Sequence, residues 1–172
     1  EDLWLALCGC IGDGFLPDFA KQAEKEYFEL WRDVKTAFEG LYETELGRIT
    51  RILSFALKDR TSNVVKMMKF LFSASPRDIL EENRKNTMLL RYNQVNEKYQ
   101  KLLEKARNFG RKGKLLYFQY GGELSISADI ANELYYNYPD KIIVVAYIKG
   151  TKVNISLRGH DVKEITIKAI QG

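Results

Sequence analysis

Cysteine is scarce in this sequence, and the two cysteines present are poorly placed for the structures that cysteine usually supports. Among 172 residues only Cys8 and Cys10 occur, two positions apart inside an apolar run. This spacing is poor geometry for a disulfide, and two ligands are too few for a zinc site. We therefore expect two buried thiols in a reducing compartment, which is typical of a cytoplasmic protein.

Long apolar runs and export signals are also missing. No run reaches the roughly 20 apolar residues that a membrane-spanning helix needs. The N-terminus has neither the basic region nor the cleavage site of a signal peptide. The sequence is 45% hydrophobic and 12% aromatic, which is enough to fill one medium core or two small ones. We expect a soluble, cytoplasmic protein that does not bind membranes.

The net charge of +4 conceals an uneven distribution along the chain. Between Glu1 and Leu46 there are 11 acidic and 4 basic residues, whereas between Arg84 and Lys114 there are 10 basic and 2 acidic residues. The basic stretch suits a polyanion passing nearby, although a solvated helix face is the more common explanation. The cations proposed for nucleic-acid backbone contacts are Arg107, Arg111, Lys112 and Lys114.

Helical spacing of apolar residues dominates the first half of the chain, over residues 20–82. Two series cover residues 23–38 and 49–57, and Gly40 and Gly47 are expected to break the pattern. A short helix is predicted over residues 64–72. Its aromatic and methionine side chains, like those of the other stripes, are expected to pack in the core. Ser75 is expected to cap a further short helix that begins at Pro76.

A longer helix is predicted over residues 82–109, because its apolar residues alternate steps of four and three. Tyr92 and Tyr99 lie on this seam, which makes them poor candidates for stacking against bases. Two glycines around basic residues, Gly110 and Gly113, end the helix. We expect it to connect two bodies.

The last third of the chain is predicted to be an α/β unit with the element order β, α, β, β, α. The expected elements are a strand over 115–120, a helix over 127–138 opened by Ser125 or Ser127, a buried strand over 142–148, a hairpin partner over 153–157, and a helix capped by Asp161.

Asp13 stands between two glycines directly after an apolar helix, in the segment Leu5 to Phe19. Gly12 and Gly14 allow backbone conformations that a side chain would forbid, and such a loop suits a metal or phosphate site. The simpler interpretation, favoured by spacing alone, is that Asp13 caps a turn or the next helix.

A second polar segment lies at the end of the last predicted strand, in Ile155-Ser156-Leu157-Arg158-Gly159. An arginine there could bind two phosphate oxygens, with Ser156 adding a hydroxyl donor. A polar pair at the end of a strand is nevertheless common. His160 follows this segment, and we interpret it as a surface or capping residue.

Together, ALCGCIGDG around Asp13 and KVNISLRG around Arg158 resemble motifs of the DHH phosphoesterase family, most closely the archaeal RecJ-like nucleases. The resemblance covers nearly the whole chain. It implies an α/β protein with three parts: the mainly helical end of a DHH catalytic domain (1–83), a connector helix (84–110) and an incomplete DHH-associated domain with a mixed sheet (111–172). Asp13 would be a metal ligand, and Ser156 and Arg158 would contact a substrate phosphate.

Several family motifs do not occur in this sequence. The D-x-D motif, a second aspartate and the Asp-His-His motif belong before Glu1, and the G-G-G-H substrate loop belongs after Gly172. We therefore interpret the chain as a fragment that is inactive alone.

In the intact protein the resemblance implies hydrolysis of phosphodiester bonds in single-stranded DNA or RNA by two Mn²⁺ or Mg²⁺ ions, in replication or repair. Two alternatives stay open. One is a phosphodiesterase of the same family that acts on short oligonucleotides or cyclic dinucleotides. The other is a nuclease-inactive replication scaffold that binds the GINS complex, with the acidic region 20–82 as its docking surface.

Overall fold

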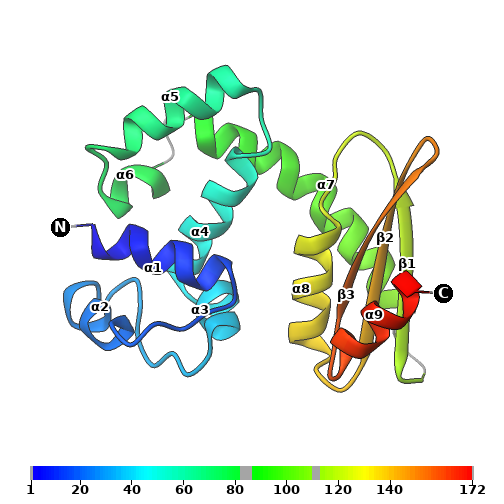
Figure 1. The fold of residues 1–172 in the computed structure, drawn as a ribbon. Coiled ribbons are helices and arrows are strands. Elements are labelled where there is room, and N and C mark those ends of the chain that lie inside the picture. Colours follow the sequence, from blue (N-terminus) through cyan, green and yellow to red (C-terminus); the bar gives the residue numbers. More distant parts are fainter. Residues whose placement is uncertain (1, 82–86, 110–112, 172) are drawn as a thin grey trace. The chain divides into compact units, whose positions relative to one another are not determined.

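The computed structural model describes residues 2–81, 87–109 and 113–171, which form two compact units, Glu1–Asn96 and Glu97–Gly172 (Figure 1). The chain is mostly helical with one small mixed sheet, so the predicted α/β class is confirmed. The long helix α7 (Thr87–Phe109) begins in the first unit and continues into the second. The assignment of the parts to a DHH domain architecture stays a prediction. No helix within the described ranges has the length and apolarity needed to cross a membrane.

The first unit is built from short helices around an aliphatic core. Its helices before α7 are α1 (Leu3–Gly12), α2 (Ala20–Glu26), α3 (Ala37–Glu43), α4 (Glu45–Ala56), α5 (Thr61–Leu71) and α6 (Pro76–Leu80). The α1 stripe of Trp4, Leu7, Cys8 and Ile11 is buried against α4, as the apolar run predicts. The cap at Ser75 is also confirmed, because its hydroxyl accepts the Asp78 N–H while the Asp78 carboxylate accepts the Ser75 N–H.

Gly40 and Gly47 do not break helices, contrary to the prediction. Gly40 lies inside α3 and Gly47 inside α4, and the break between the two helices falls at Thr44, which caps α4. A methyl group on Gly47 would collide with the carbonyl oxygens of Gly40 and Leu41. Gly47 therefore allows close packing of two helix backbones, and Gly40 leaves room for the Trp31 ring. Sequence spacing cannot distinguish either role from a helix stop.

The predicted continuous helix over residues 23–38 is also wrong. Helix α2 ends at Glu26, and the chain stays irregular until Thr36 caps α3. Within this segment Asp33 has a positive φ of 57°, which no helix tolerates in its interior. The apolar residues Leu30 and Trp31 still point into the core from a non-helical backbone, and this imitates helical periodicity.

The stripe predicted as packing over residues 64–72 is only partly buried. Met67 is buried, and Val64 and Leu71 pack against the core. Val65, Met68 and Phe72 are instead 47%, 50% and 89% exposed, which corrects their interpretation as packing residues.

The second unit is a three-stranded sheet with helices beside it, in the predicted order β, α, β, β, α. After α7 it contains β1 (Leu115–Gly121), α8 (Ser127–Asn137), β2 (Ile142–Lys149), β3 (Lys152–Arg158) and α9 (Val162–Gln171). The sheet order is β1-β2-β3, with β1 parallel to β2 and β3 antiparallel to β2. The predicted hairpin across Gly150 is confirmed, whereas neither predicted serine caps α8, since Ile126 occupies the N-cap position.

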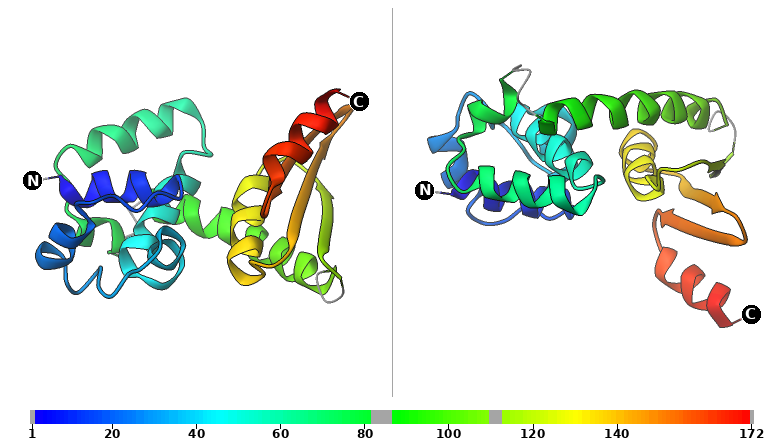
Figure 2. Two further views of the ribbon diagram at one scale, coloured as in Figure 1. Left: turned by 60° about the horizontal axis from the view of Figure 1, so that its bottom comes forward. Right: turned by 90° about the horizontal axis from the view of Figure 1, so that it is seen from above.

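The two faces of this sheet differ in what covers them. One face, with Phe118, Val145 and Ser156 aligned across the strands, packs on α8 and α7. We call the other face the open face. Its exposed apolar residues are Leu115, Tyr117, Ile148, Val153 and Ile155, at 37–65% exposure. Figure 2 (right) shows α8 on one side of the sheet and α9 on the other.

Candidate functional site

Asp13 ends helix α1 in a Schellman motif. It occupies the C-cap position, the next residue Gly14 has a φ of 76°, and the Gly14 and Phe15 N–H groups donate to Ile11 (3.0 Å) and Cys10 (2.9 Å). This pattern requires glycine at position 14, where most side chains would be strained. Gly12 is an ordinary helical residue, so the expectation of an unusual backbone at that position is wrong.

The Asp13 side chain lies at the surface of the first unit. Its described hydrogen bonds use the backbone N–H, which donates to Gly9 and Cys10. Within residues 2–81, 87–109 and 113–171, no group of three His, Cys, Asp or Glu side chains is close enough to hold a metal ion. The described residues therefore do not form a metal centre by themselves.

Ser156 and Arg158 lie in the second unit, on the face of β3 that packs on α8. The Ser156 hydroxyl is 3.0 Å from the hydroxyl of the buried Ser127, and Arg158 Nε donates to Asn132 Oδ1 at 2.6 Å. The two strand residues are about 6.6 Å apart along β3, and five residues of helix span about 7.5 Å. The spacing of the two residues along β3 is therefore similar to the spacing of their two partners along the axis of α8.

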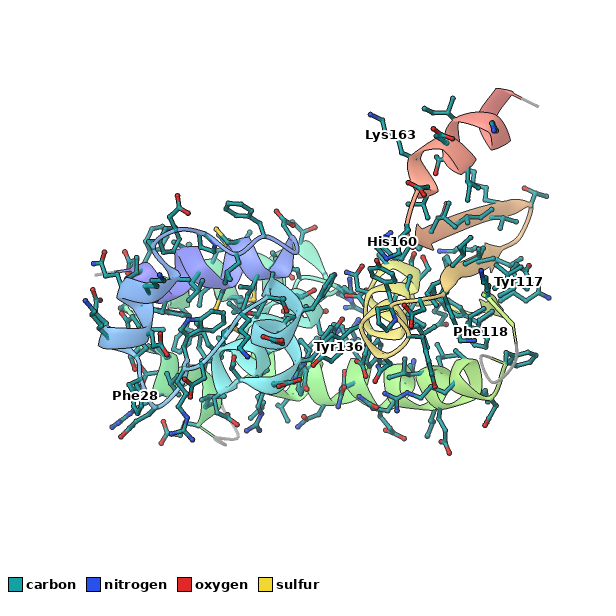
Figure 3. All side chains as sticks on the ribbon, turned by 90° about the horizontal axis from the view of Figure 1, so that it is seen from below. Phe28, Tyr117, Phe118, Tyr136, His160 and Lys163 are labelled. Carbon is teal, nitrogen blue, oxygen red and sulfur yellow. The ribbon has the colours of Figure 1, made fainter. Side chains whose placement is uncertain are left out.

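His160 continues this series of contacts just beyond the end of β3. It is exposed, as predicted, and its ring lies edge-on to Tyr135 of α8, with the ring centroids 6.5 Å apart. Figure 3 shows His160 beside α8. The contacts Ser156–Ser127, Arg158–Asn132 and His160–Tyr135 thus join β3 to α8, and we call them the β3–α8 ladder.

The Arg158 guanidinium retains donors after these contacts. A guanidinium carries five N–H groups. One binds Asn132 and one, on Nη1, binds the Leu157 carbonyl oxygen at 2.8 Å, which leaves three that make no hydrogen bond with a described residue. The side chain is half-buried, so these donors lie at the boundary between the ladder and solvent.

The basic stretch carries fewer unpaired cations than its sequence suggests. Arg107 forms an ion pair with Glu133 at 3.1 Å, Lys101 pairs with Glu97 at 2.6 Å, and the half-buried Arg91 donates to the Lys58 carbonyl oxygen. Lys114 is exposed, whereas Arg111 and Lys112 lie outside the described residues. A polyanion would therefore meet a discontinuous set of charges on α7.

Tyr99 is buried on α7, as its seam position predicts, and its hydroxyl donates to the Glu133 carboxylate. Glu133 thus binds both Tyr99 and Arg107 and ties α8 to α7. Neither Asn132 nor Glu133 was identified from the sequence. Both are ordinary polar helix residues there, and only the packing of α8 between β3 and α7 makes them significant.

Comparisons with protein-family models, curated proteins and solved structures found no match to this chain.

Proposed function

We propose that this chain is part of a metal-dependent phosphodiesterase that hydrolyses single-stranded DNA or RNA, with the end of β3 binding a phosphate of the substrate. The observation that carries the proposal is the arrangement of Ser156 and Arg158, which are adjacent on one face of β3 and held by Ser127 and Asn132. An arginine fixed by two hydrogen bonds, with three N–H groups remaining, loses little side-chain entropy when it binds a phosphate oxygen.

Asp13 is the proposed metal ligand. The described residues do not complete a site for Mn²⁺ or Mg²⁺, so the proposal assigns the other ligands to the motifs that the resemblance places before Glu1. Carboxylate oxygens suit both cations, and the Schellman motif holds the backbone of Asp13 while its carboxylate is exposed.

The phosphate contact is tested by measuring affinity for a labelled single strand over a salt series. We expect Arg158→Ala in the full-length protein to weaken binding and to reduce the slope of log K against log salt by about 0.7, the value for one phosphate contact on a single strand. Lys152→Ala is the control, because Lys152 is an exposed cation at the other end of the same strand. An unchanged slope in Arg158→Ala would reject the phosphate role.

The metal role of Asp13 is tested by Mn²⁺-dependent hydrolysis in the full-length protein. Asp13→Ala should abolish hydrolysis and leave the thermal midpoint unchanged, since the fold uses only the backbone of this residue in the hydrogen bonds described above. Asp18→Ala, an exposed aspartate five residues further along, is the matched control. Full activity in the Asp13 variant would remove it from the ligand set.

A second candidate function is a nuclease-inactive replication scaffold that binds GINS. It is favoured by the side of α5 that leaves Val65, Met68 and Phe72 exposed, near Lys66 and Lys69. Exposed apolar side chains of this kind are common where proteins bind one another. A full-length protein that binds GINS and hydrolyses no single strand with Mn²⁺ or Mg²⁺ would establish this function instead.

A further inference from the structure

The open face of the sheet is apolar almost throughout. Besides its five exposed apolar residues it contains Ile142, Val144 and Leu157, which are half-buried, and Ala146, which is buried by its neighbours on the sheet. On β1, the polar groups of the open face are the Gln119 side chain and the Tyr117 hydroxyl. The hydroxyl donates a hydrogen bond to Gln119 Oε1. A sheet with a parallel strand pair is normally covered on both faces, because its strands are apolar on both.

Helix α9 also leaves apolar side chains exposed. Every side chain from Lys163 to Lys168 is exposed, including Ile165 at 41% and Ile167 at 45%. Glu164 and Lys168, four residues apart, share one side of α9, whereas Val162 and Ile165, three residues apart, share another. An apolar side of this kind is ordinarily buried. It lies on the side of the sheet away from α8 (Figure 2, right).

The link between β3 and α9 is short and has an unusual backbone. It consists of residues 159–161, in which Gly159 has a φ of 144° and Asp161 a φ of 58°. Gly159 cannot be replaced without strain, since a Cβ there would approach the Ile142 Cα to 3.2 Å. Small changes in these dihedral angles redirect the helix relative to the strand, as expected of a hinge.

We propose that α9 docks on the open face and covers Val153 and Ile155, so that the sheet is enclosed between α8 and α9. A three-residue link holds α9 at an effective concentration in the millimolar range beside this face, well above the concentration of any second copy in a dilute solution. The docked helix would bury Ile165 with the aliphatic side chains of β3, while Glu164 and Lys168 stay in solvent.

The test measures how fast a water-soluble maleimide labels a cysteine on the open face of the full chain. Ile155→Cys is the probe, and Lys152→Cys, exposed on the same strand but outside the open face, is the matched control. Peptide mass spectrometry locates the label, so Cys8 and Cys10 do not interfere. We expect Cys at position 155 to react about tenfold more slowly than at position 152, which corresponds to a docked population of about 90%.

Adding Ile165→Asp and Ile167→Asp to the Ile155→Cys variant should restore fast labelling of the cysteine. Burying the new carboxylates against the apolar open face would be unfavourable, so α9 should no longer dock. The single change Ile165→Ser, which disturbs helix formation less, should restore it in part. Equally fast labelling at positions 155 and 152 in the parent would overturn the proposal. So would slow labelling at position 155 that persists in both α9 variants, or protection that increases with protein concentration, which would indicate a second copy as the occupant.

Discussion

Arg158 Nε and Asn132 Oδ1 lie 2.6 Å apart and join the end of β3 to the middle of α8. Together with the bond from Arg158 Nη1 to the Leu157 carbonyl oxygen, this bond restricts the orientation of the guanidinium plane. Asn132 is therefore a positioning residue for whatever the remaining Arg158 donors bind.

Replacing Asn132 with alanine should weaken single-strand binding by about tenfold, roughly the free energy of one hydrogen bond to a charged group. The salt slope should stay unchanged, since the positive charge of Arg158 remains. Asn137→Ala is the control on the same helix, where the side chain is exposed and donates to the Glu133 carbonyl oxygen. Wild-type affinity in Asn132→Ala, together with a clear loss in Arg158→Ala, would show that Arg158 needs no positioning by α8.

Two glycines inside helices should respond to alanine with opposite signs. Gly47→Ala should lower the free energy of unfolding by about 3 kcal/mol, because the new methyl group meets backbone carbonyl oxygens that cannot move independently. Gly9→Ala in α1 should raise it by about 0.5 to 1 kcal/mol, since nothing lies within 4 Å of the new methyl group and alanine favours helix. Urea denaturation of both variants measures the difference, and a neutral Gly47→Ala would mean that α3 and α4 are further apart than described.

Cys8 should make stability depend on pH in the alkaline range. Burial raises the pKa of its thiol from the ordinary 9.0 to about 11, and a hydrogen bond with Thr50 only partly offsets this. The folded protein then holds the thiol proton more tightly than the unfolded chain. The stabilisation from this proton is complete below pH 9 and is lost as the pH rises toward 11. The loss amounts to about 2 kcal/mol at pH 10.5.

The measurement compares urea unfolding of the wild type and Cys8→Ala at pH 8 and pH 10.5. Both proteins lose stability from other groups, so the informative quantity is the difference between them. The wild type should lose about 2 kcal/mol more than the variant. Equal losses would indicate that the thiol ionises in the folded protein as it does in the unfolded chain.

Local signals in the sequence predicted much of the fold. Ser75 before Pro76 specifies a cap through its own side chain, and the apolar run 142–148 identifies a strand without reference to the rest of the chain. The prediction that this strand is buried holds only in part, because Ile142 and Val144 are half-buried and Ile148 is exposed. The seam position of Tyr99 also predicted its burial. In each of these cases the residues that determine the structure are close together in the sequence.

The features that sequence reasoning missed depend on distant partners. Gly47 resembles a helix breaker until α3 is placed beside it, and Leu30 and Trp31 fit a helical period although their backbone is irregular. The candidate site shows the same division. Arg158 was identified from its strand-end motif, whereas Asn132 has no signal of its own and becomes relevant only when α8 packs on β3.

The contact between α3 and α4 has a consequence for how this sequence can diverge. Because Gly47 faces carbonyl oxygens of the neighbouring helix, no rearrangement of side chains elsewhere makes room for a larger residue there. A library randomised at positions 9 and 47 and selected for folding should therefore keep glycine at position 47 and drift freely at position 9. In diverged relatives that keep the contact between α3 and α4, glycine should therefore persist at position 47 while the exposed positions of both helices change.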